Sequence, residues 1–329
     1  MNFCCKDRNS FLLENYFFLR TFGNNSSIKK YKNMNRRQFI GRSAALIAAG
    51  SIAQNLFVAC TASATKLNKG RIGIQLYSIK DELAKDFMGS LKKLSETGYS
   101  MVEPYGFTKD EFFGHTMKEL SNIVNDMGMS ISGSHIWSNI SVNDPTEKEW
   151  DFWKKISGIV KSGGGEWAVQ SSLPKVETVD DLERIVSYFN KAAEICKQGD
   201  VRFAFHNHTE VFHEVEGELI IDYLVKNTDP DLVFFQLDLG HTVNGGGDCI
   251  RIIRNFPKRI VLWHASDFNA TTRKYTDVGE GSVPYPALFE MAESSGLERL
   301  IVEQETTSDI FASCKADFDY LKQFKWTKV

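Results

Sequence analysis

The stretch Val201-Arg202-Phe203-Ala204-Phe205-His206-Asn207-His208 decides the fold of this 329-residue chain. It is an apolar, strand-forming run that ends in two imidazoles. The same design returns in Leu237-Asp238-Leu239-Gly240-His241, Trp263-His264-Ala265-Ser266-Asp267 and Val302-Glu303-Gln304-Glu305. The four segments lie roughly 30 residues apart, the length of a strand–helix repeat. The alternative is four unrelated polar loops, but the common spacing favours one repeating α/β unit.

Strand-like and helix-like runs alternate along the chain on both sides of these segments. Strands are predicted over residues 71–77, 101–103, 130–135, 166–170, 201–205, 232–237, 259–263 and 300–302. Helices are predicted over residues 86–97, 116–127, 146–161, 179–197, 217–226, 248–255, 285–295 and 311–324. This order favours an α/β fold closed into a (β/α)8 TIM barrel. An open doubly wound sheet would want a glycine-rich turn after the first strand, and Gln75-Leu76-Tyr77-Ser78 has none.

The N-terminal region has the pattern of an export signal. Arg36-Arg37-Gln38-Phe39-Ile40 precedes an uncharged, mostly apolar stretch at residues 43–60. Twin arginines before such a stretch predict a Tat signal, with an ordinary anchor helix as the alternative. Because Met34 directly precedes the signal, we expect the native protein to start there. The predicted organisation is a non-native upstream extension at residues 1–33, a Tat-type signal or lipoprotein segment at residues 34–64, and a barrel domain at residues 65–329.

Two sequences compete as the end of this signal. Phe57-Val58-Ala59-Cys60 is similar to a lipobox, in which an acylated Cys60 would tether the protein to a membrane. Ala62-Ser63-Ala64 instead offers a small-residue cleavage site. Both alternatives predict a protein of the periplasm or of its membrane face.

Charge and cysteine content argue against a nucleic-acid-binding protein and against a fold held by disulfides or zinc. Residues 1–60 hold nine of the 39 Lys and Arg residues and two of the 42 Asp and Glu residues, so the remainder carries 30 basic and 40 acidic groups. An acidic domain argues against a nucleic-acid partner, which needs a basic surface. Beyond residue 60 the cysteines are Cys196, Cys249 and Cys314, whose spacing suggests neither a disulfide framework nor a zinc knuckle.

The polar residues at the strand ends are candidate metal ligands. Because the carboxyl ends of all strands in a barrel meet at one rim, these side chains are expected to converge. Converging nitrogen and oxygen ligands suggest one divalent ion, such as Mn²⁺, Zn²⁺, Co²⁺ or Fe²⁺. Asp238, His264 and Glu303 are the first candidates. Their alternative roles are a helix cap, a core histidine and a structural ion pair.

Further site residues follow from their positions beside these three. His206 and His208 lie on the same side of their strand, so one is expected to be a ligand and the other an acid or base. Glu305 is a further acid–base candidate or an alternative ligand, and Asp267 is expected to orient His264 or to contact substrate. Three residues at the ends of the second and third strands are expected to line the substrate pocket: Glu103, His135 and Trp137.

Several segments, taken together and in order, resemble those of a known family. They are Gly73-Ile74-Gln75-Leu76-Tyr77-Ser78, His206-Asn207-His208, Leu237-Asp238-Leu239-Gly240-His241, Gly279-Glu280-Gly281 and Val302-Glu303-Gln304-Glu305. The family is the sugar phosphate isomerase/epimerase superfamily, a xylose isomerase-like TIM-barrel group that also includes endonuclease IV and inosose dehydratase. The resemblance spans about residues 70–326 and implies a carbohydrate substrate. It also implies one divalent ion at the carboxyl rim, held by four residues: His206, Asp238, His264 and Glu303.

One departure from the family shapes the expected chemistry. The commoner ligand on the fifth strand is a glutamate that acts with the glutamate of the eighth strand as paired acid and base, and here His206 takes its place. We therefore expect metal-assisted proton abstraction next to a carbonyl, through an enediolate, with His208, His241 or Glu305 moving the proton.

Three outcomes remain open from the sequence. The leading expectation is a sugar isomerase or epimerase. The alternative is a lyase or dehydratase acting on 3-keto-glycosides or inosose-like substrates. A third possibility, from another class, is a non-catalytic periplasmic carbohydrate-binding protein. The sequence predicts no oligomeric state.

Overall fold

The computed structural model describes residues 70–107, 110–138, 140, 145–305 and 307–328. The predicted upstream extension, the Tat signal and the tether at Cys60 lie outside these residues. Among the helices that the structure describes, none has both the length and the apolar character needed to cross a membrane.

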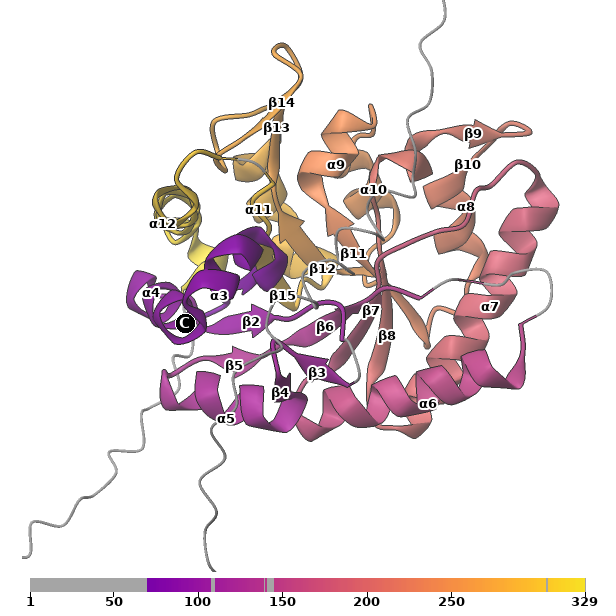
Figure 1. Cartoon of the computed structure of the whole chain (residues 1–329). Helices are drawn as coiled ribbons and strands as arrows, with labels where there is room; N and C mark the ends of the chain where they lie inside the picture. Colours follow the sequence, from indigo (N-terminus) through magenta and orange to yellow (C-terminus); the bar gives the residue numbers. More distant parts are fainter. Residues whose placement is uncertain (1–69, 108–109, 139, 141–144, 306, 329) are drawn as a thin grey trace, which may run out of the picture. The chain divides into compact units, whose positions relative to one another are not determined.

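The structure is a nearly closed parallel barrel, which confirms the predicted fold class (Figure 1). Its main sheet has the order β5-β2-β1-β15-β12-β11-β8-β7-β6. The segments β5 and β6 are two parts of the predicted third strand; β5 pairs with β2 and β6 pairs with β7, so together they close the ring. The strands are β1 (Ile72–Gln75), β2 (Met101–Glu103), β5 (Ser130–Ile131), β6 (Gly133–Ile136), β7 (Trp167–Gln170), β8 (Arg202–His206), β11 (Val233–Asp238), β12 (Ile260–Ala265) and β15 (Arg299–Val302).

Helices cover the outside of the strands (Figure 1). They are α3 (Lys80–Lys85), α4 (Phe87–Thr97), α5 (Met117–Asp126), α6 (Glu147–Ser162), α7 (Val179–Gln198), α8 (Ile220–Asn227), α9 (Leu239–Asn244), α10 (Cys249–Asn255), α11 (Tyr285–Ser295) and α12 (Ile310–Leu321). Short 3₁₀ turns are η1 (Leu76–Ile79), η2 (Thr209–Phe212) and η3 (Lys325–Thr327).

Among the residues that the structure describes, three short hairpins interrupt the connections that follow strands. They are β3 (Glu111–Phe112) with β4 (His115–Thr116), β9 (Glu214–Val215) with β10 (Glu218–Leu219), and β13 (Asp267–Asn269) with β14 (Lys274–Thr276). The pairing of β9 with β10 uses residues that periodicity assigned to a helix, so α8 begins at Ile220 instead of residue 217.

Helix α7 shows how the sequence specifies the outer layer. Thr178 caps its first turn, and the side chain of Asp181 accepts the backbone N–H of Thr178 in return. Apolar residues at helical spacing then face the barrel, and the ring of Phe189 lies 5.3 Å from that of Phe203 and 5.2 Å from that of Phe205, both on β8. This packing fixes β8, which carries His206 at its end.

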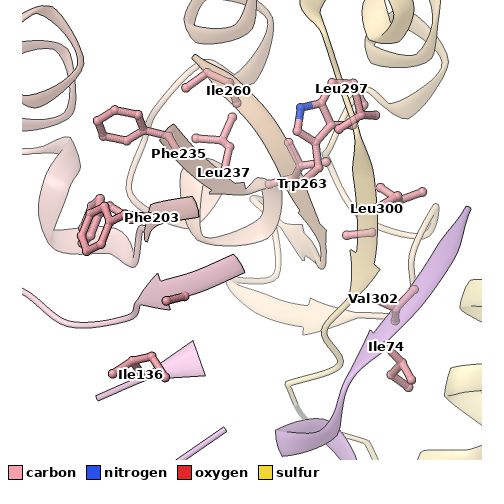
Figure 2. Packing of buried hydrophobic residues seen from close by; sticks show 14 of the residues in the cluster. Ile74, Ile136, Phe203, Phe235, Leu237, Ile260, Trp263, Leu297, Leu300 and Val302 are labelled. Atoms are coloured by element: carbon pink, nitrogen blue, oxygen red, sulfur yellow. The ribbon is translucent and has the colours of Figure 1, made fainter. Parts of the chain in front are cut away.

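Alternation along the strands separates an apolar outer layer from the barrel interior. On β12, Trp263 packs outward against Phe289 of α11, as part of the cluster drawn in Figure 2. A small separate cluster contains Leu262 with Trp167, Val169, Ala204 and Val261. Two residues beyond Leu262 and Ala204 stand His264 and His206. The same alternation that builds the core therefore places polar side chains at the carboxyl end of the interior.

Candidate metal centre and acid–base site

Four predicted ligands meet at the carboxyl ends of neighbouring strands. His206 ends β8, Asp238 ends β11, His264 lies in β12, and Glu303 follows β15. Each offers one donor atom, and these atoms all lie within 4.8 Å of one another. All four side chains are buried. The fold thus brings together two imidazoles and two carboxylates from a span of almost 100 residues.

Two potential metal-binding atoms in this cluster have no hydrogen-bond partner. The first is Nε2 of His206, which is buried. Its other ring nitrogen lies 3.2 Å from Oε1 of Gln236, an acceptor, so Nδ1 carries the hydrogen and Nε2 presents a lone pair. Burial and the surrounding histidines hold the pKa of His206 well below its ordinary value, which keeps the ring neutral.

The second unpartnered atom is Oδ2 of Asp238. Oδ1 of the same carboxylate accepts the backbone N–H of His241 and the hydroxyl of Ser266, both at 2.6 Å. One oxygen therefore caps helix α9, while the other has no partner and could serve in the predicted ligand role. A buried polar atom without a partner is costly, and a cation would satisfy both of these atoms. The residues present therefore fit a divalent ion of the predicted class.

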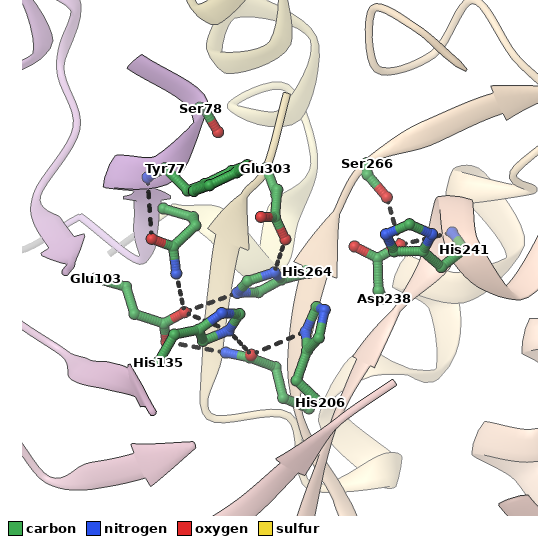
Figure 3. Close-up of polar contacts among 12 residues, drawn as sticks. Tyr77, Ser78, Glu103, His135, His206, Asp238, His241, His264, Ser266 and Glu303 are labelled. Carbon is green, nitrogen blue, oxygen red and sulfur yellow. Dashed lines mark hydrogen bonds and ion pairs between the residues drawn. The ribbon is translucent and has the colours of Figure 1, made fainter. Parts of the chain in front are cut away.

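His264 is held between two carboxylates (Figure 3). Its Nδ1 lies 2.6 Å from Oε2 of Glu303, and its Nε2 lies 2.8 Å from Oε1 of Glu103. Burial opposes a charged ring, yet these carboxylates prevail and raise the pKa of His264 to about 10. A metal ion binds a deprotonated ring nitrogen. Of the two nitrogens of His264, Nδ1 faces Glu303, which is another residue of the cluster, so Nδ1 is the expected ligand atom.

Glu103 organises the polar layer beside the cluster. Its carboxylate accepts hydrogen bonds from the amides of Gln75 and Gln236, both at 2.9 Å, and contacts the rings of His264 and His135. Burial alone would raise the pKa of Glu103, but the two histidines hold it well below its usual range. A carboxylate that fixes the second nitrogen of a ligand histidine is a common support of metal sites.

The structure places the remaining predicted pocket residues at different depths. His135 is buried beside Glu103, and its ring stacks on His264 at 4.8 Å. Trp137 is 72% exposed. Asp267 accepts backbone N–H groups from four residues of its own connection, namely Phe268, Gly279, Gly281 and Val283. Asp267 therefore holds a loop in place, and Glu103 and Glu303, instead of Asp267, bond the ring of His264.

The three acid–base candidates lie together beside the metal cluster. Nε2 of His241 lies 3.1 Å from Oε1 of Glu305, and its ring centre lies 4.9 Å from that of His208. The hydroxyl of Tyr275 is 2.5 Å from Nδ1 of His241. Burial opposes charge on His241, but Asp238 and Glu305 raise its pKa to about 9. Burial and the neighbouring His241 lower the pKa of His208. Two adjacent imidazoles are thus biased toward different protonation states, as an acid and a base require.

The other side of the site has a different character. Two residues beyond Gln75, Glu103 and His135 come three aromatic residues: Tyr77, Tyr105 and Trp137. Their strands β1, β2 and β6 form one arc of the ring, whereas β8, β11 and β15, which precede the acid–base residues, lie on the other arc. The carboxyl rim therefore has an aromatic side and an acid–base side.

Sequence reasoning missed the residues that connect this network. Gln75 and Gln236 were not singled out, and neither were Ser266 and Tyr275. For the glutamines a signal existed, because each is a polar residue at an inward position of an otherwise apolar strand. Tyr275 lies on the β13–β14 hairpin, which the sequence pattern did not reveal.

Comparison with known proteins identifies the family. The family model described as Xylose isomerase-like TIM barrel matches residues 91–328. The chain belongs to this family. It is similar to a solved structure titled sugar phosphate isomerase/epimerase from Parabacteroides distasonis ATCC 8503, with 27% identity, a TM-score of 0.71 and coverage of 79% of this chain and 100% of the other. A structure of L-ribulose 3-epimerase matches with a TM-score of 0.61, coverage of 78% of this chain and 95% of the other, and 15% identity, which shows the fold alone.

Curated relatives are named inosose dehydratase. The protein from Geobacillus kaustophilus (strain HTA426) is 24% identical over 193 residues, 54% of this chain and 60% of the relative. The protein from Lacticaseibacillus casei is 26% identical over 146 residues, 39% of this chain and 48% of the relative. The chain thus matches about half to three-fifths of the length of these relatives. Membership in this family and the named relatives support the prediction that the chain is an enzyme.

Proposed function

We propose that the protein is a metal-dependent lyase that removes a proton next to a carbonyl of a sugar-like substrate and expels a leaving group from the adjacent carbon. The observation that carries the proposal is the placement of His208, His241 and Glu305 on one side of the carboxyl rim. Proton removal and protonation of the leaving oxygen can then occur from the same side of the substrate. An epimerase that inverts a carbon needs proton-transfer groups on both sides. The rim positions after β1, β2 and β6 are the aromatic Tyr77, Tyr105 and Trp137. Glu103 and His135, which precede two of them, are already bonded to His264 and Gln236.

The roles of the chain's own residues follow from their contacts. His206, Asp238, His264 and Glu303 would hold the divalent ion, which supplies Lewis-acid polarisation of the substrate oxygen when bound. His208, the more neutral imidazole, accepts the proton from carbon. His241, in contact with Glu305, donates a proton to the departing oxygen. One C–H and one C–O bond break, a carbon–carbon double bond forms, and water or an alcohol leaves.

A same-side isomerase is the second candidate function. The acid–base residues that support elimination can also return the proton to the neighbouring carbon on the same face. The similarity to the Parabacteroides structure titled sugar phosphate isomerase/epimerase favours it. It differs from the lyase only in whether a leaving group departs.

Incubation in heavy water separates these reactions. The metal-loaded protein is given 3-keto-glycosides, inososes and free ketoses, and products are analysed by mass spectrometry and NMR. The lyase predicts a released alcohol or water and an unsaturated keto product. Solvent deuterium in an intact, isomerised sugar would establish the isomerase instead, and inversion of one stereocentre would contradict the same-side arrangement.

We also propose export by the Tat route, on the basis of Arg36-Arg37 and the apolar stretch at residues 43–60. Residues 34–64 fused to a reporter should direct it to the periplasm, and replacing both arginines by lysine should prevent this. Labelling with a radioactive fatty acid in the wild type, and loss of the label in Cys60→Ala, would establish the membrane tether.

A further inference from the structure

We infer that the aromatic side of the carboxyl rim is a second binding subsite, which holds a flat, uncharged ring joined to the reacting sugar. The substrate would then be a glycoside with an aryl aglycone. This inference rests on the proposed function and specifies its substrate class.

Exposed large apolar side chains gather on one arc of the barrel. Within residues 70–107, 110–138, 140, 145–305 and 307–328, they are Met88 at 50%, Phe113 at 40% and Trp137 at 72% exposure. These three residues follow β1, β2 and β6, which are consecutive in the ring. Apolar surface that is concentrated in this way marks a binding site more often than scattered exposed residues do.

A connected row of rings joins this arc to the polar layer around Glu103. Tyr77 contacts Tyr105 edge-on at 5.1 Å, and Tyr105 contacts Phe112 at 5.5 Å. Phe112 is buried in the β3–β4 hairpin and contacts the exposed Phe113 at 5.0 Å. The row begins two residues beyond Gln75, whose amide bonds Glu103. It therefore connects the layer beside the predicted metal cluster, through the buried Phe112, to the exposed Phe113.

Trp137 extends the same side of the site. Its strand β6 contributes His135 to the polar layer, whereas Ile136 is buried in the outer core. Because Trp137 directly follows β6, strand alternation predicts that it lies on the side of His135. An indole held there, largely exposed to solvent, offers a flat face on which a ring can stack.

The backbone of Phe113 supports a ligand-binding role. Phe113 has a φ of 49° and the next residue, Gly114, a φ of 77°, so both occupy the left-handed region at the tip of the hairpin. Turns of this kind favour asparagine or glycine, and a bulky residue there costs on the order of 1–2 kcal/mol. A strained residue whose side chain remains 40% exposed gains only part of the packing energy that would offset this cost. Such strain is typical of functional positions.

The chemistry of the two sides indicates how a substrate lies. The acid–base side presents His208, His241 and Glu305, which suit sugar hydroxyls and the leaving oxygen. The aromatic side presents the exposed indole of Trp137 and the partly exposed ring of Phe113, which suit an apolar ring, whereas the face of Tyr77 is covered by Nζ of Lys80 at 3.7 Å. Because the leaving oxygen joins sugar and aglycone in a glycoside, a substrate with an aryl aglycone can use both sides at once.

Equilibrium binding tests the subsite without requiring turnover. Unoxidised phenyl glucosides and methyl glucosides, in both anomeric forms, are titrated calorimetrically into metal-loaded protein. We expect one phenyl glucoside to bind at least tenfold more tightly than the matching methyl glucoside. In Trp137→Ala and Phe113→Asn this preference should fall below threefold. Equal affinity for the two glucosides, no binding of either, or a preference that both variants retain would overturn the inference.

The variants also separate binding from folding. Asparagine tolerates the left-handed conformation, so Phe113→Asn should preserve or raise the melting temperature while it weakens phenyl glucoside binding. Phe256→Ala, in the connection between α10 and β12 at the opposite end of the barrel, is the control and should keep the preference. If phenyl glucosides bind as expected but no keto-glycoside is cleaved, the proposed reaction fails while the subsite stands.

Discussion

Nε2 of His264 lies 2.8 Å from a carboxylate oxygen of Glu103, although 161 positions separate the two residues in the chain. This contact leaves Nδ1 of the same ring facing Glu303 within the metal cluster. Glu103 thereby determines which nitrogen of His264 is offered to an ion. We therefore expect Glu103 to act as a positioning residue that orients the predicted ligand His264.

Loss of the Glu103 charge should weaken metal binding. Glu103→Gln keeps the shape of the side chain but removes the charge that orients His264, so affinity for the divalent ion should fall about 10- to 100-fold. Competition with a fluorescent chelator measures the change. Glu183→Gln, an exposed residue of α7, serves as the matched control and should bind like the wild type. Unaltered affinity in Glu103→Gln would remove its assigned role.

Metal loading should stabilise the fold. An ion that binds the native state at a concentration 100 times its Kd adds about 2.7 kcal/mol to the free energy of unfolding. Chelator-treated protein should therefore melt at a lower temperature than protein given Mn²⁺, Zn²⁺, Co²⁺ or Fe²⁺, as calorimetry will show. The shift should be smaller in Asp238→Asn. Identical melting with and without all four ions would contradict the site.

The acid–base assignment predicts a specific kinetic pattern. His208→Gln and His241→Gln should each lower kcat by roughly 10²- to 10⁴-fold, because each removes a group that moves a proton. Metal content should stay near that of the wild type. The double variant should lose less than the product of the two single losses, since the residues act on one reaction. Single variants that retain kcat within threefold would show that neither imidazole carries the proton.

Asp267 should matter for stability through its loop. Its carboxylate accepts backbone N–H groups of Phe268, Gly279, Gly281 and Val283, and several would lose their partner in Asp267→Ala. Phe268 and Val283 are buried, whereas Gly279 is exposed. A buried donor without a partner costs about 1–3 kcal/mol, so the variant should lose roughly 2–6 kcal/mol in denaturant unfolding. Glu280→Gln, an exposed change in the same loop, should have little effect. Equal stability of the two variants would contradict this prediction.

The buried Asp317 predicts how stability depends on pH. Its carboxylate accepts the N–H of Val278 and the amide of Gln304, yet burial raises its pKa to about 7. A carboxyl whose pKa is raised in the folded state stabilises below its unfolded pKa of 3.8, and this contribution is lost as the pH rises toward about 7. Between pH 4 and pH 8 the group therefore costs the wild type on the order of a few kcal/mol.

Asp317→Asn removes this titration, so its melting temperature should change less between those pH values than that of the wild type. Asp319→Asn, on the same helix but only partly buried and paired with Lys315 and Lys322, is the comparison. A wild type and an Asp317→Asn variant with parallel pH profiles would contradict the assignment.

The barrel and the four cluster residues were accessible to sequence reasoning for a physical reason. Apolar runs mark the strands, and parallel strands in a ring must end together, so His206, Asp238, His264 and Glu303 had to meet near one rim. The supporting contacts were not accessible in this way. Whether Glu103 lines a pocket or orients His264 depends on the depth at which the barrel closes, which the strand pattern does not encode. The proximity of Asp267 to His264 in the sequence likewise predicts a contact between them, whereas in the structure the carboxylate accepts N–H groups from the loop at residues 277–283.

The two oxygens of Asp238 limit which substitutions can alter the metal preference of this protein. One oxygen begins α9 through the N–H of His241, and the other faces the place of the cation. A substitution that retunes ion preference at this position would also displace the imidazole proposed to move a proton. Metal choice and reactivity are therefore inherited together, and a new cofactor preference would have to arise at His206, His264 or Glu303.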